Sequence, residues 1–483
     1  MRLFSIRSLL ALFVLGLLFA GCDVELQDDN GDAPTAIVIT STPASPDHPD
    51  PTPTSRAEEW SPTTTATEGT EAVKDPATAT PNVPNASPTA TPADSQDSTN
   101  QARAEIEDIE QAVVEIRGLE VLEDLDVQII DRQELVNRIE TILAEEYSEE
   151  EARIDALSYW LLRLIPDETL DLYQLQVDLL SEQVAGYYDP DTKELVVVTE
   201  SGELSVTDKV TMAHEIVHAL QDQHFDLIEI DELATDADRG VAITALIEGD
   251  ATFAMTEYLL GYLDPLELAE LLAESLTAGD TQVLDSAPRY VSEGLLFSYE
   301  AGQSFVTEIH NNGGYAAIDQ ALNDPPTSTE QIIHPEKYIG PNRDEPIDVQ
   351  NPDVSEDLGA GWELLRSDVL GEWDFQIMLE ENGATSPEAT RAAAGWGGSR
   401  FDIYESDTGT LALLTTRWDT DEDASEFAGA LLASFQSNAV NGGIWSESNR
   451  HFSVVASGDT VVMISGTDRE AVERVLAVME QTV

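Results

Sequence analysis

Apolar residues recur every three or four positions through the middle of the chain, which is the pattern of helices buried along one face. Between residues 104 and 155 the positions with this spacing are Ile106, Ile109, Val113, Ile116, Leu135, Ile139 and Leu143. Acidic residues fill many of the positions between them. We therefore expect this stretch to be largely helical scaffold, and we predict a further helix over residues 170–184.

The spacing changes after this helix. Tyr187 and Tyr188 precede the turn-forming run Asp-Pro-Asp-Thr at 189–192, and a β-branched stretch follows at 195–198. Turn residues between two such runs predict a β-hairpin. We expect the strand near Leu195 to Val198 to be a sheet edge, where an extended peptide could add as a further strand. The acidic turn could instead bind calcium, but it lacks the ligand spacing of an EF-hand.

The C-terminal part has another composition. From about residue 345 an acidic connection leads to stretches of alternating or β-branched residues at 401–403, 410–417, 452–456 and 461–464. Helical patterns at 424–435 and 470–479 lie among them. This order predicts a small α/β domain, with two helices packed on an antiparallel sheet. It contains no cluster of metal-binding or nucleophilic residues, so a scaffold role and a role in positioning substrate both stay open.

The N-terminal residues indicate export. Arg2 and Arg7 precede a short apolar run at 9–19, which is typical of a signal peptide and too short to span a membrane. The run ends in Phe-Ala-Gly-Cys, which resembles a bacterial-type lipoprotein signal with Phe19 at a position usually held by a Leu-like residue. We therefore expect a signal peptide over 1–21 and a lipid on Cys22, the only cysteine. The alternative is an ordinary secretory signal cut nearby.

Thr, Pro, Ser, Ala and Asp dominate the next segment. Large apolar residues are rare there, so burial cannot offset the entropy of ordering. We predict a disordered stalk over 22–103, a first folded domain over 104–344 and a second over 345–483. The expected location is the cell envelope, lipid-anchored and facing outward, outside the cytoplasm.

The charge is strongly negative. The chain carries 94 Asp and Glu against 23 Lys and Arg, a formal net charge of -71. Because phosphates would be repelled, nucleic acid is excluded as an expected partner. Lysine occurs only at positions 74, 193, 209 and 337. An acidic, lysine-poor surface suits concentrated salt, which screens self-repulsion, although an acidic lineage would explain the same composition.

The chemistry-bearing motif is H-E-x-x-H at residues 214–218. On a helix, His214 and His218 lie one turn apart on the same face and can offer two nitrogens to one zinc ion. Glu215 stands beside the open coordination position, where it can take a proton from the zinc-activated water. Ser205 and Asp208 suggest a capping-box start for this helix. A buried or solvated His pair without metal is the alternative.

A catalytic zinc site needs a third protein ligand. His224 has the spacing of a longer motif, but that motif needs Gly where this chain has Gln221. On a continuous helix, His224 would lie roughly 240° around from His218. Glu248 is the stronger candidate, because it stands alone in an apolar predicted helix and a buried charge needs a partner. The small residues Ala245, Gly249 and Ala251 are expected to let this helix approach the His-bearing one.

These residues resemble the gluzincin branch of the zincins, the thermolysin-like zinc metallopeptidases. The resemblance rests on His214, Glu215 and His218 on one helix with Glu248 on the next, and covers about 184–338. It implies that the two His and Glu248 bind Zn2+ and that Glu215 is the general base. Thr252 stands where the family often has an acidic group, so Asp250 or Asp222 is the candidate for orienting a ligand imidazole. The implied fold is α+β: a mostly helical zincin-like catalytic domain with a small β-sheet, followed by a small α/β sandwich domain.

Peptide hydrolysis also needs a donor for the developing oxyanion. His334, in the polar loop 324–338, is the first candidate, with Tyr338 and Tyr299 as reserves. Each could equally be a packing residue. The sequence thus predicts a membrane-tethered zinc peptidase acting on protein or peptide substrates. The alternatives are a non-catalytic surface lipoprotein that binds a protein or polysaccharide beside a structural or degenerate metal site, and a protein that captures zinc for nutrition.

Overall fold

The computed structural model describes residues 92–199, 202–277, 282–435, 439–441, 443–447 and 449–482, together with two short paired strands, β1 (Asp23–Val24) and β2 (Ile39–Thr40). The predicted signal peptide, Cys22 and most of the predicted stalk lie outside the described residues. Helix α2 (Pro92–Arg117) begins inside the segment predicted as stalk. Its N-terminal proline suits a helix start, where no backbone N–H is needed.

Three helices and a small sheet follow α2. The helices are α3 (Arg132–Glu146), α4 (Glu149–Leu161) and α5 (Leu172–Gln183). The predicted hairpin is confirmed as β4 (Gly186–Asp189) paired antiparallel with β5 (Glu194–Val198).

The expectation that β5 forms a sheet edge is wrong. A strand absent from the prediction, β3 (Asp126–Ile130), pairs in parallel with β5, so the order is β3-β5-β4 and β5 is central. The edges are β3 and β4. Residues 104–155 are therefore not wholly helical, because the short apolar run in β3 gains its ladder partner from a segment far along the chain.

The central helices carry the candidate site. They are α6 (Val206–Phe225), α7 (Leu227–Asp231), α8 (Ala237–Tyr262), α9 (Pro265–Thr277), α10 (Gln282–Ser286), α11 (Arg289–Gly313), α12 (Tyr315–Asn323), α13 (Thr329–Ile333) and α14 (Pro335–Tyr338). The predicted capping box is confirmed: the Ser205 side chain accepts from the Asp208 N–H, and Asp208 accepts from the Ser205 N–H. Helix α8 packs against both α6 and α11.

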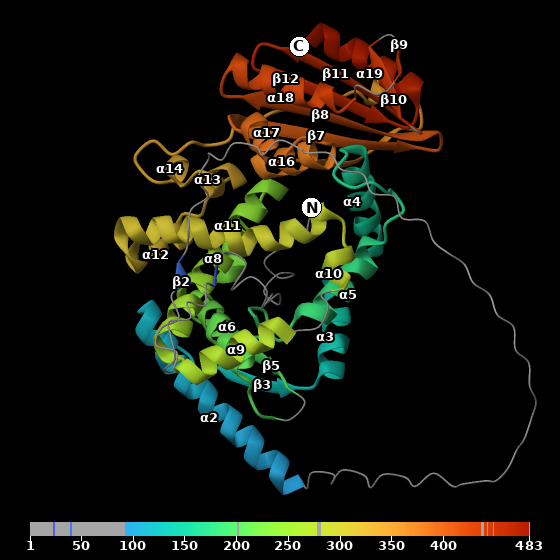
Figure 1. Ribbon diagram of the computed structural model, residues 1–483. Helices are drawn as coiled ribbons and strands as arrows, with labels where there is room; N and C mark the ends of the chain where they lie inside the picture. Colours follow the sequence, from blue (N-terminus) through green and yellow to red (C-terminus); the bar gives the residue numbers. More distant parts are fainter. Residues whose placement is uncertain are drawn as a thin grey trace, which may run out of the picture. The chain divides into compact units, whose positions relative to one another are not determined.

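The C-terminal part is a seven-stranded sheet (Figure 1). Its strands are β6 (Glu363–Asp368), β7 (Trp396–Ser406), β8 (Gly409–Trp418), β9 (Ala439–Asn441), β10 (Ile444–Glu447), β11 (Arg450–Ser457) and β12 (Thr460–Gly466). The order is β6-β7-β8-β12-β11-β10-β9, and every neighbouring pair is antiparallel. The sheet predicted for this part is confirmed.

Helices cover this sheet on both faces. They are α16 (Glu372–Glu381), α17 (Ser386–Ala393), α18 (Asp421–Ala433) and α19 (Arg469–Thr482), and a short helix α15 (Ser355–Leu358) packs on α19. Leu413 of β8 belongs to the apolar cluster beneath α19. Trp418 stacks on Phe427 of α18 with ring centroids 4.5 Å apart. Leu413 and Trp418 lie an odd number of positions apart on one strand, so they point to opposite faces.

Aromatic contacts join the sheet to the helices. Trp373 of α16 stacks on Tyr290 of α11 at 5.3 Å, and the Tyr290 hydroxyl donates to Asp374 at 2.7 Å. Residues Gln96–Val483 belong to one compact unit. The α+β class is thereby confirmed: a mostly helical part with a small sheet, followed by a sheet part with packed helices. Among the described residues, no helix combines the length and apolar character needed to cross a bilayer.

Candidate metal centre

Helix α6 brings the two histidines of the motif together. His214 and His218 are both buried, and their Nε2 atoms lie 3.0 Å apart with the rings nearly perpendicular, at 83°. The capping box begins the helix, and the fully buried residues Val210, Ile216 and Val217 hold it in the core. Because the two histidines are four residues apart on one helix, their rings lie one turn apart on the same face and their Nε2 atoms meet.

Glu248 of α8 meets them there. Its Oε2 lies 3.0 Å from Nε2 of His214 and 3.5 Å from Nε2 of His218. These three residues each offer one ligand atom within 4.8 Å of the others. Two imidazole nitrogens and a carboxylate oxygen are a donor set that zinc takes in catalytic sites, with the fourth position left for water or substrate. The residues thus fit the metal that the motif implies.

His224 faces elsewhere, as expected for an unbroken helix. Its Nε2 lies 2.7 Å from the Glu120 carbonyl oxygen. Helix α6 continues through position 221 to Phe225 and ends where Asp226 adopts a left-handed conformation, φ 57°. Without a glycine to turn the chain earlier, this third histidine is carried around the helix and away from His218.

A hydrogen bond defines the tautomer of His218. The amide nitrogen of Gln221 donates to the Ile247 carbonyl at 3.1 Å and to Asp250 Oδ2 at 2.8 Å. Both partners are acceptors, so the amide oxygen must be the atom 2.9 Å from His218 Nδ1. That oxygen can only accept, so Nδ1 carries a proton. In the neutral ring, Nε2 then has a free lone pair directed at His214 and Glu248, as a metal ligand requires.

Opposite charges at the centre shift two pKa values. Burial disfavours charge on Glu248, but the neighbouring His218 and His214 outweigh it and lower the pKa of Glu248 to about 2. Burial likewise opposes charge on His218, and the Glu248 carboxylate raises its pKa to about 9. Each of these two shifts depends on the charge of the other group, so the pair shares a proton when no cation is bound. A cation bound at this point would displace that proton and keep the carboxylate ionised, because metal ligands bind in their deprotonated form.

Glu215 lies on the same helix with its carboxylate held in place. Its Oε2 accepts from the backbone N–H of Tyr188, in edge strand β4, at 3.0 Å. Burial raises the pKa of Glu215 to about 8, although His218 works in the opposite direction. Without a cation nearby this carboxyl is mostly protonated at neutral pH, and a cation held by the neighbouring ligands would favour the ionised form that a general base requires. The arrangement suits a general base.

Of the three oxyanion candidates, Tyr299 is the one that contacts the ligand set. Its ring centroid, on α11, lies 6.0 Å from that of His214, and its side chain hydrogen-bonds to Glu248. Burial raises the pKa of the Tyr299 hydroxyl well above its usual range, so it keeps its proton and can donate.

His334, the first candidate, has another partner. Its Nε2 lies 3.0 Å from Glu372 Oε1 of α16, and this hydrogen bond raises the pKa of His334. The Tyr338 hydroxyl donates to the Asp324 carbonyl at 2.9 Å. The contacts therefore do not support the ranking of His334 above Tyr299. Tyr299 lies on α11, which places its ring beside His214, whereas His334 pairs with Glu372 of α16. Nothing local in the sequence distinguishes these two environments.

The two aspartates proposed to orient an imidazole have different partners. Asp250 reaches His218 only through Gln221. Asp222 accepts from the Tyr188 hydroxyl at 2.7 Å and pairs with Lys193 at 2.5 Å, so it fixes the hairpin to α6. The sequence reasoning missed Gln221 and Tyr188 as site residues. For Gln221 a signal was available: it stands three residues after His218 on the same helix, where two side chains can contact each other. No side-chain signal indicated Tyr188, which contributes its backbone N–H.

A second cluster of acidic residues, Glu330, Asp344 and Asp419, forms ion pairs with Lys337. Nζ of Lys337 lies 2.5 Å from Glu330, 3.1 Å from Asp344 and 3.1 Å from Asp419. These carboxylates could otherwise hold a metal. The ammonium group already supplies their positive charge, so the His214, His218 and Glu248 group is the better metal site.

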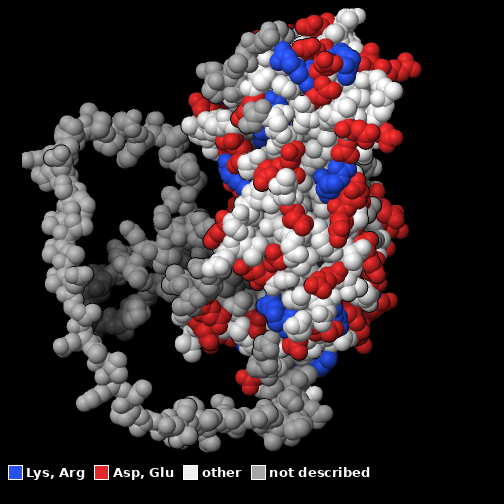
Figure 2. Space-filling view, turned by 90° about the vertical axis from the view of Figure 1, so that its right-hand side faces the viewer, with Lys and Arg blue, Asp and Glu red and all other residues white. Residues whose placement is uncertain are grey.

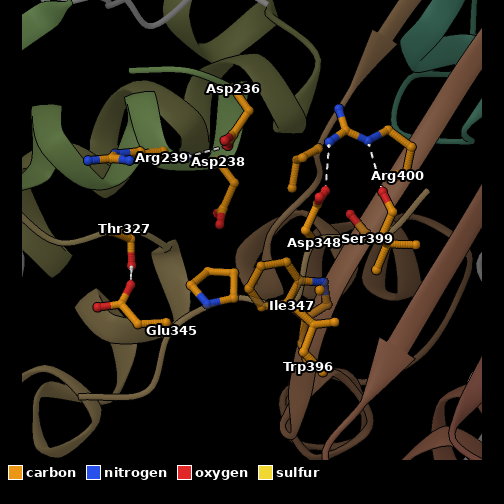
Figure 3. A pocket seen from close by; sticks show the side chains of 14 residues that line it. Asp236, Asp238, Arg239, Thr327, Glu345, Ile347, Asp348, Trp396, Ser399 and Arg400 are labelled. Carbon is orange, nitrogen blue, oxygen red and sulfur yellow. Dashed lines mark hydrogen bonds and ion pairs between the residues drawn. The ribbon is translucent and has the colours of Figure 1, made fainter. Parts of the chain in front are cut away.

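A cavity of about 230 Å³ lies between the start of α8 and the sheet (Figure 3). Asp238, Ile347 and Trp396 are among its lining residues. The figure shows the carboxyl group of Asp238 directed toward the cavity. Burial raises the pKa of Asp238 well above its usual range, although Thr329 donates two hydrogen bonds to it. No residue of the metal-ligand group lines this cavity.

Comparison with known proteins adds one match. A family model described as a domain of unknown function (DUF8575) matches residues 362–476, from just before β6 into α19. No curated protein and no solved structure matches the chain. The matched segment is confined to the sheet part and carries no stated activity, so the grounds for a function are the contacts of the metal-ligand group.

Proposed function

We propose that this chain is a zinc-dependent peptidase of the zincin type, exported from the cytoplasm and tethered to the membrane through a lipid on Cys22. One observation supports the catalytic proposal above all: Nε2 of His214, Nε2 of His218 and Oε2 of Glu248 converge, with Glu215 on the same helix. Zinc bound there would polarise a water molecule and the scissile carbonyl.

The residues around the ligands have assignable tasks. Glu215 takes the proton of the attacking water and returns it to the leaving amine. Tyr188, through its backbone N–H, fixes the position of the Glu215 carboxylate. Tyr299 donates its hydroxyl proton as a hydrogen bond to the developing oxyanion. Edge strand β4, rather than the central strand β5, is the strand beside Glu215, and it positions the base because its Tyr188 N–H donates to the Glu215 carboxylate.

The decisive experiment is Glu215→Gln on the purified chain, with zinc content and peptide-library cleavage both measured. The substitution removes a base but no metal ligand, so zinc content should stay at the wild-type level while turnover falls by about a thousandfold or more. Glu229→Gln makes the same chemical change on an exposed residue of α7 and should alter neither reading. A wild-type chain that binds zinc but cleaves nothing would favour the non-catalytic alternative.

A further inference from the structure

A buried polar chain leads from the metal ligand His218 to the last turn of α2. His218 Nδ1 donates to Gln221 Oε1 at 2.9 Å, and Gln221 Nε2 donates to Asp250 Oδ2 at 2.8 Å. Nε of Arg117 lies 2.9 Å from one Asp250 oxygen and 3.0 Å from the other. Gln221 and Asp250 are completely buried, and Arg117 is 1% exposed.

Arg117 is held at its other end as well. Its Nη2 pairs with Asp319 of α12 at 2.7 Å, and its guanidinium lies 4.8 Å above the Tyr315 ring. Burial lowers the pKa of Arg117, but Asp250 and Asp319 outweigh this effect, so the guanidinium stays charged. A buried carboxylate keeps its charge when a paired cation and hydrogen bonds compensate the loss of water. Arg117 therefore supplies the buried positive charge that the Asp250 side chain pairs with in the core.

The acceptors around Gln221 determine which way its amide faces. The Ile247 carbonyl oxygen and Asp250 Oδ2 both accept from Nε2, so they hold the NH₂ group of Gln221 on their side. The amide oxygen is then left for His218 Nδ1. A reversed amide would put NH₂ against the imidazole and favour the tautomer with Nε2 protonated, which cannot bind a metal through Nε2.

We propose that Arg117, Asp250 and Gln221 form a positioning relay that keeps His218 in its metal-binding tautomer and orientation. The proposal rests on the metal site proposed above and adds to it. A carboxylate alone commonly orients a ligand histidine. Here an amide stands between them, and a cation from α2 sustains the carboxylate. The relay makes α2, the helix that follows the Thr- and Pro-rich segment, a part of the metal centre.

The test is a zinc titration of the full chain against a competing chelator, with the absorption spectrum of the Co2+-loaded protein as a second measurement. Gln221→Leu keeps the bulk of the side chain and removes the acceptor for His218. We expect zinc affinity to fall about 10- to 100-fold. The Co2+ absorption bands should shift, since they report ligand geometry. Gln223→Leu is the matched control on the same helix: its amide contacts the backbone of Leu122 and Glu123, and both readings should stay at wild type.

Asp250→Asn separates the relay from simple packing. Asparagine has nearly the same size but carries no negative charge for Arg117 and no second acceptor oxygen for Gln221. Zinc affinity should fall and the Co2+ bands should shift in the same direction as in Gln221→Leu. Wild-type affinity and spectrum in Gln221→Leu would overturn the relay and leave the metal site intact. A wild-type chain that binds no zinc at His214 and His218 would overturn the metal site and the relay together.

Discussion

A β-carbon added to Gly249 of α8 would lie 2.3 Å from the carbonyl oxygen of Gly302 in α11. One added to Gly302 would lie 2.1 Å from the carbonyl oxygen of Ala245. The small residues of α8 thus allow the close approach of α11, whereas the sequence suggested that they face α6. Ala245 and Gly249 are one turn apart and share a face, while Glu248 lies about 100° around the helix toward the histidines.

Gly249→Ala should therefore disturb both stability and metal binding. Because the blocking atoms are backbone, α8 and α11 must separate, at a cost of about 1–3 kcal/mol or more in unfolding free energy. Glu248 is the adjacent residue, so zinc affinity should fall as well. Urea unfolding and zinc titration measure the two effects. Gly261→Ala is the control in the same helix: nothing lies within 4 Å of its added carbon, so it should be neutral or stabilising by about 0.5–1 kcal/mol. Equal behaviour of the two variants would contradict the close approach.

Asp374 should make stability depend on pH. Burial raises its pKa to about 7, above the ordinary value of 3.8, although Tyr290 and Gly371 donate hydrogen bonds to it. A carboxyl with a raised folded-state pKa contributes stability at low pH that is lost as pH rises from the unfolded-state pKa through the folded one. Between pH 3.8 and about 7, the wild type should lose about 1.4 kcal/mol per pH unit relative to Asp374→Asn, which cannot titrate there. Parallel stability curves for the two proteins would show that Asp374 is not the titrating group.

The convergence of His214 and His218 and the helix that carries them could be predicted because the signals are local. A capping box, an apolar face and two imidazoles one turn apart all lie within α6. Glu248 could be predicted because a lone carboxylate in an apolar helix needs a partner. The hairpin of β4 and β5 is local in the same way, since its turn residues adjoin its strands.

The rest depends on contacts between distant segments. Strand β3 carries a short apolar run that becomes a strand only because β5 pairs with it, and that pairing turns the expected edge into the central strand. Tyr188 joins the site through its backbone N–H, which no side-chain pattern reveals. His334 and Tyr299 are separated only by where their segments pack, near Glu372 in one case and near His214 in the other. Residue type alone could not rank them.

Salt should stabilise the folded chain. Figure 2 shows Asp and Glu distributed over one face, with few Lys and Arg among them. Mutual repulsion among these carboxylates opposes the compact state and is screened by salt. The thermal midpoint should rise by several degrees from dilute to molar NaCl. Sucrose stabilises folded proteins without screening charge, so NaCl should raise the midpoint more than sucrose at equal osmolality. An unchanged midpoint in NaCl would count against an acidic surface adapted to salt.

Cys22→Ser tests the proposed lipid anchor. The thiol of Cys22 is the only one in the chain, so the substitution removes the sole acceptor for a thioether-linked lipid. In a bacterial host that processes lipoproteins, the wild type should partition with membranes and the variant should be released. Cys22→Ala is a second variant with the same expected outcome. Intact-mass measurement of the wild type checks the modification directly, and membrane association that survives both substitutions would disprove the anchor.

Tyr299 and His334 are distinguished by a kinetic comparison. Tyr299→Phe removes one hydroxyl at the ligand set and keeps the buried ring beside His214. If that hydroxyl donates to the oxyanion, kcat at saturating zinc should fall about 100-fold with KM little changed, because the bond strengthens only in the transition state. His334→Asn should leave kcat unchanged and alter stability instead, since the pair with Glu372 raises the pKa of His334. The contribution of that pair is present below the ordinary pKa of 6.5 and lost as pH rises through the raised one. A large loss of kcat in His334→Asn together with an active Tyr299→Phe would restore the assignment that the sequence favoured.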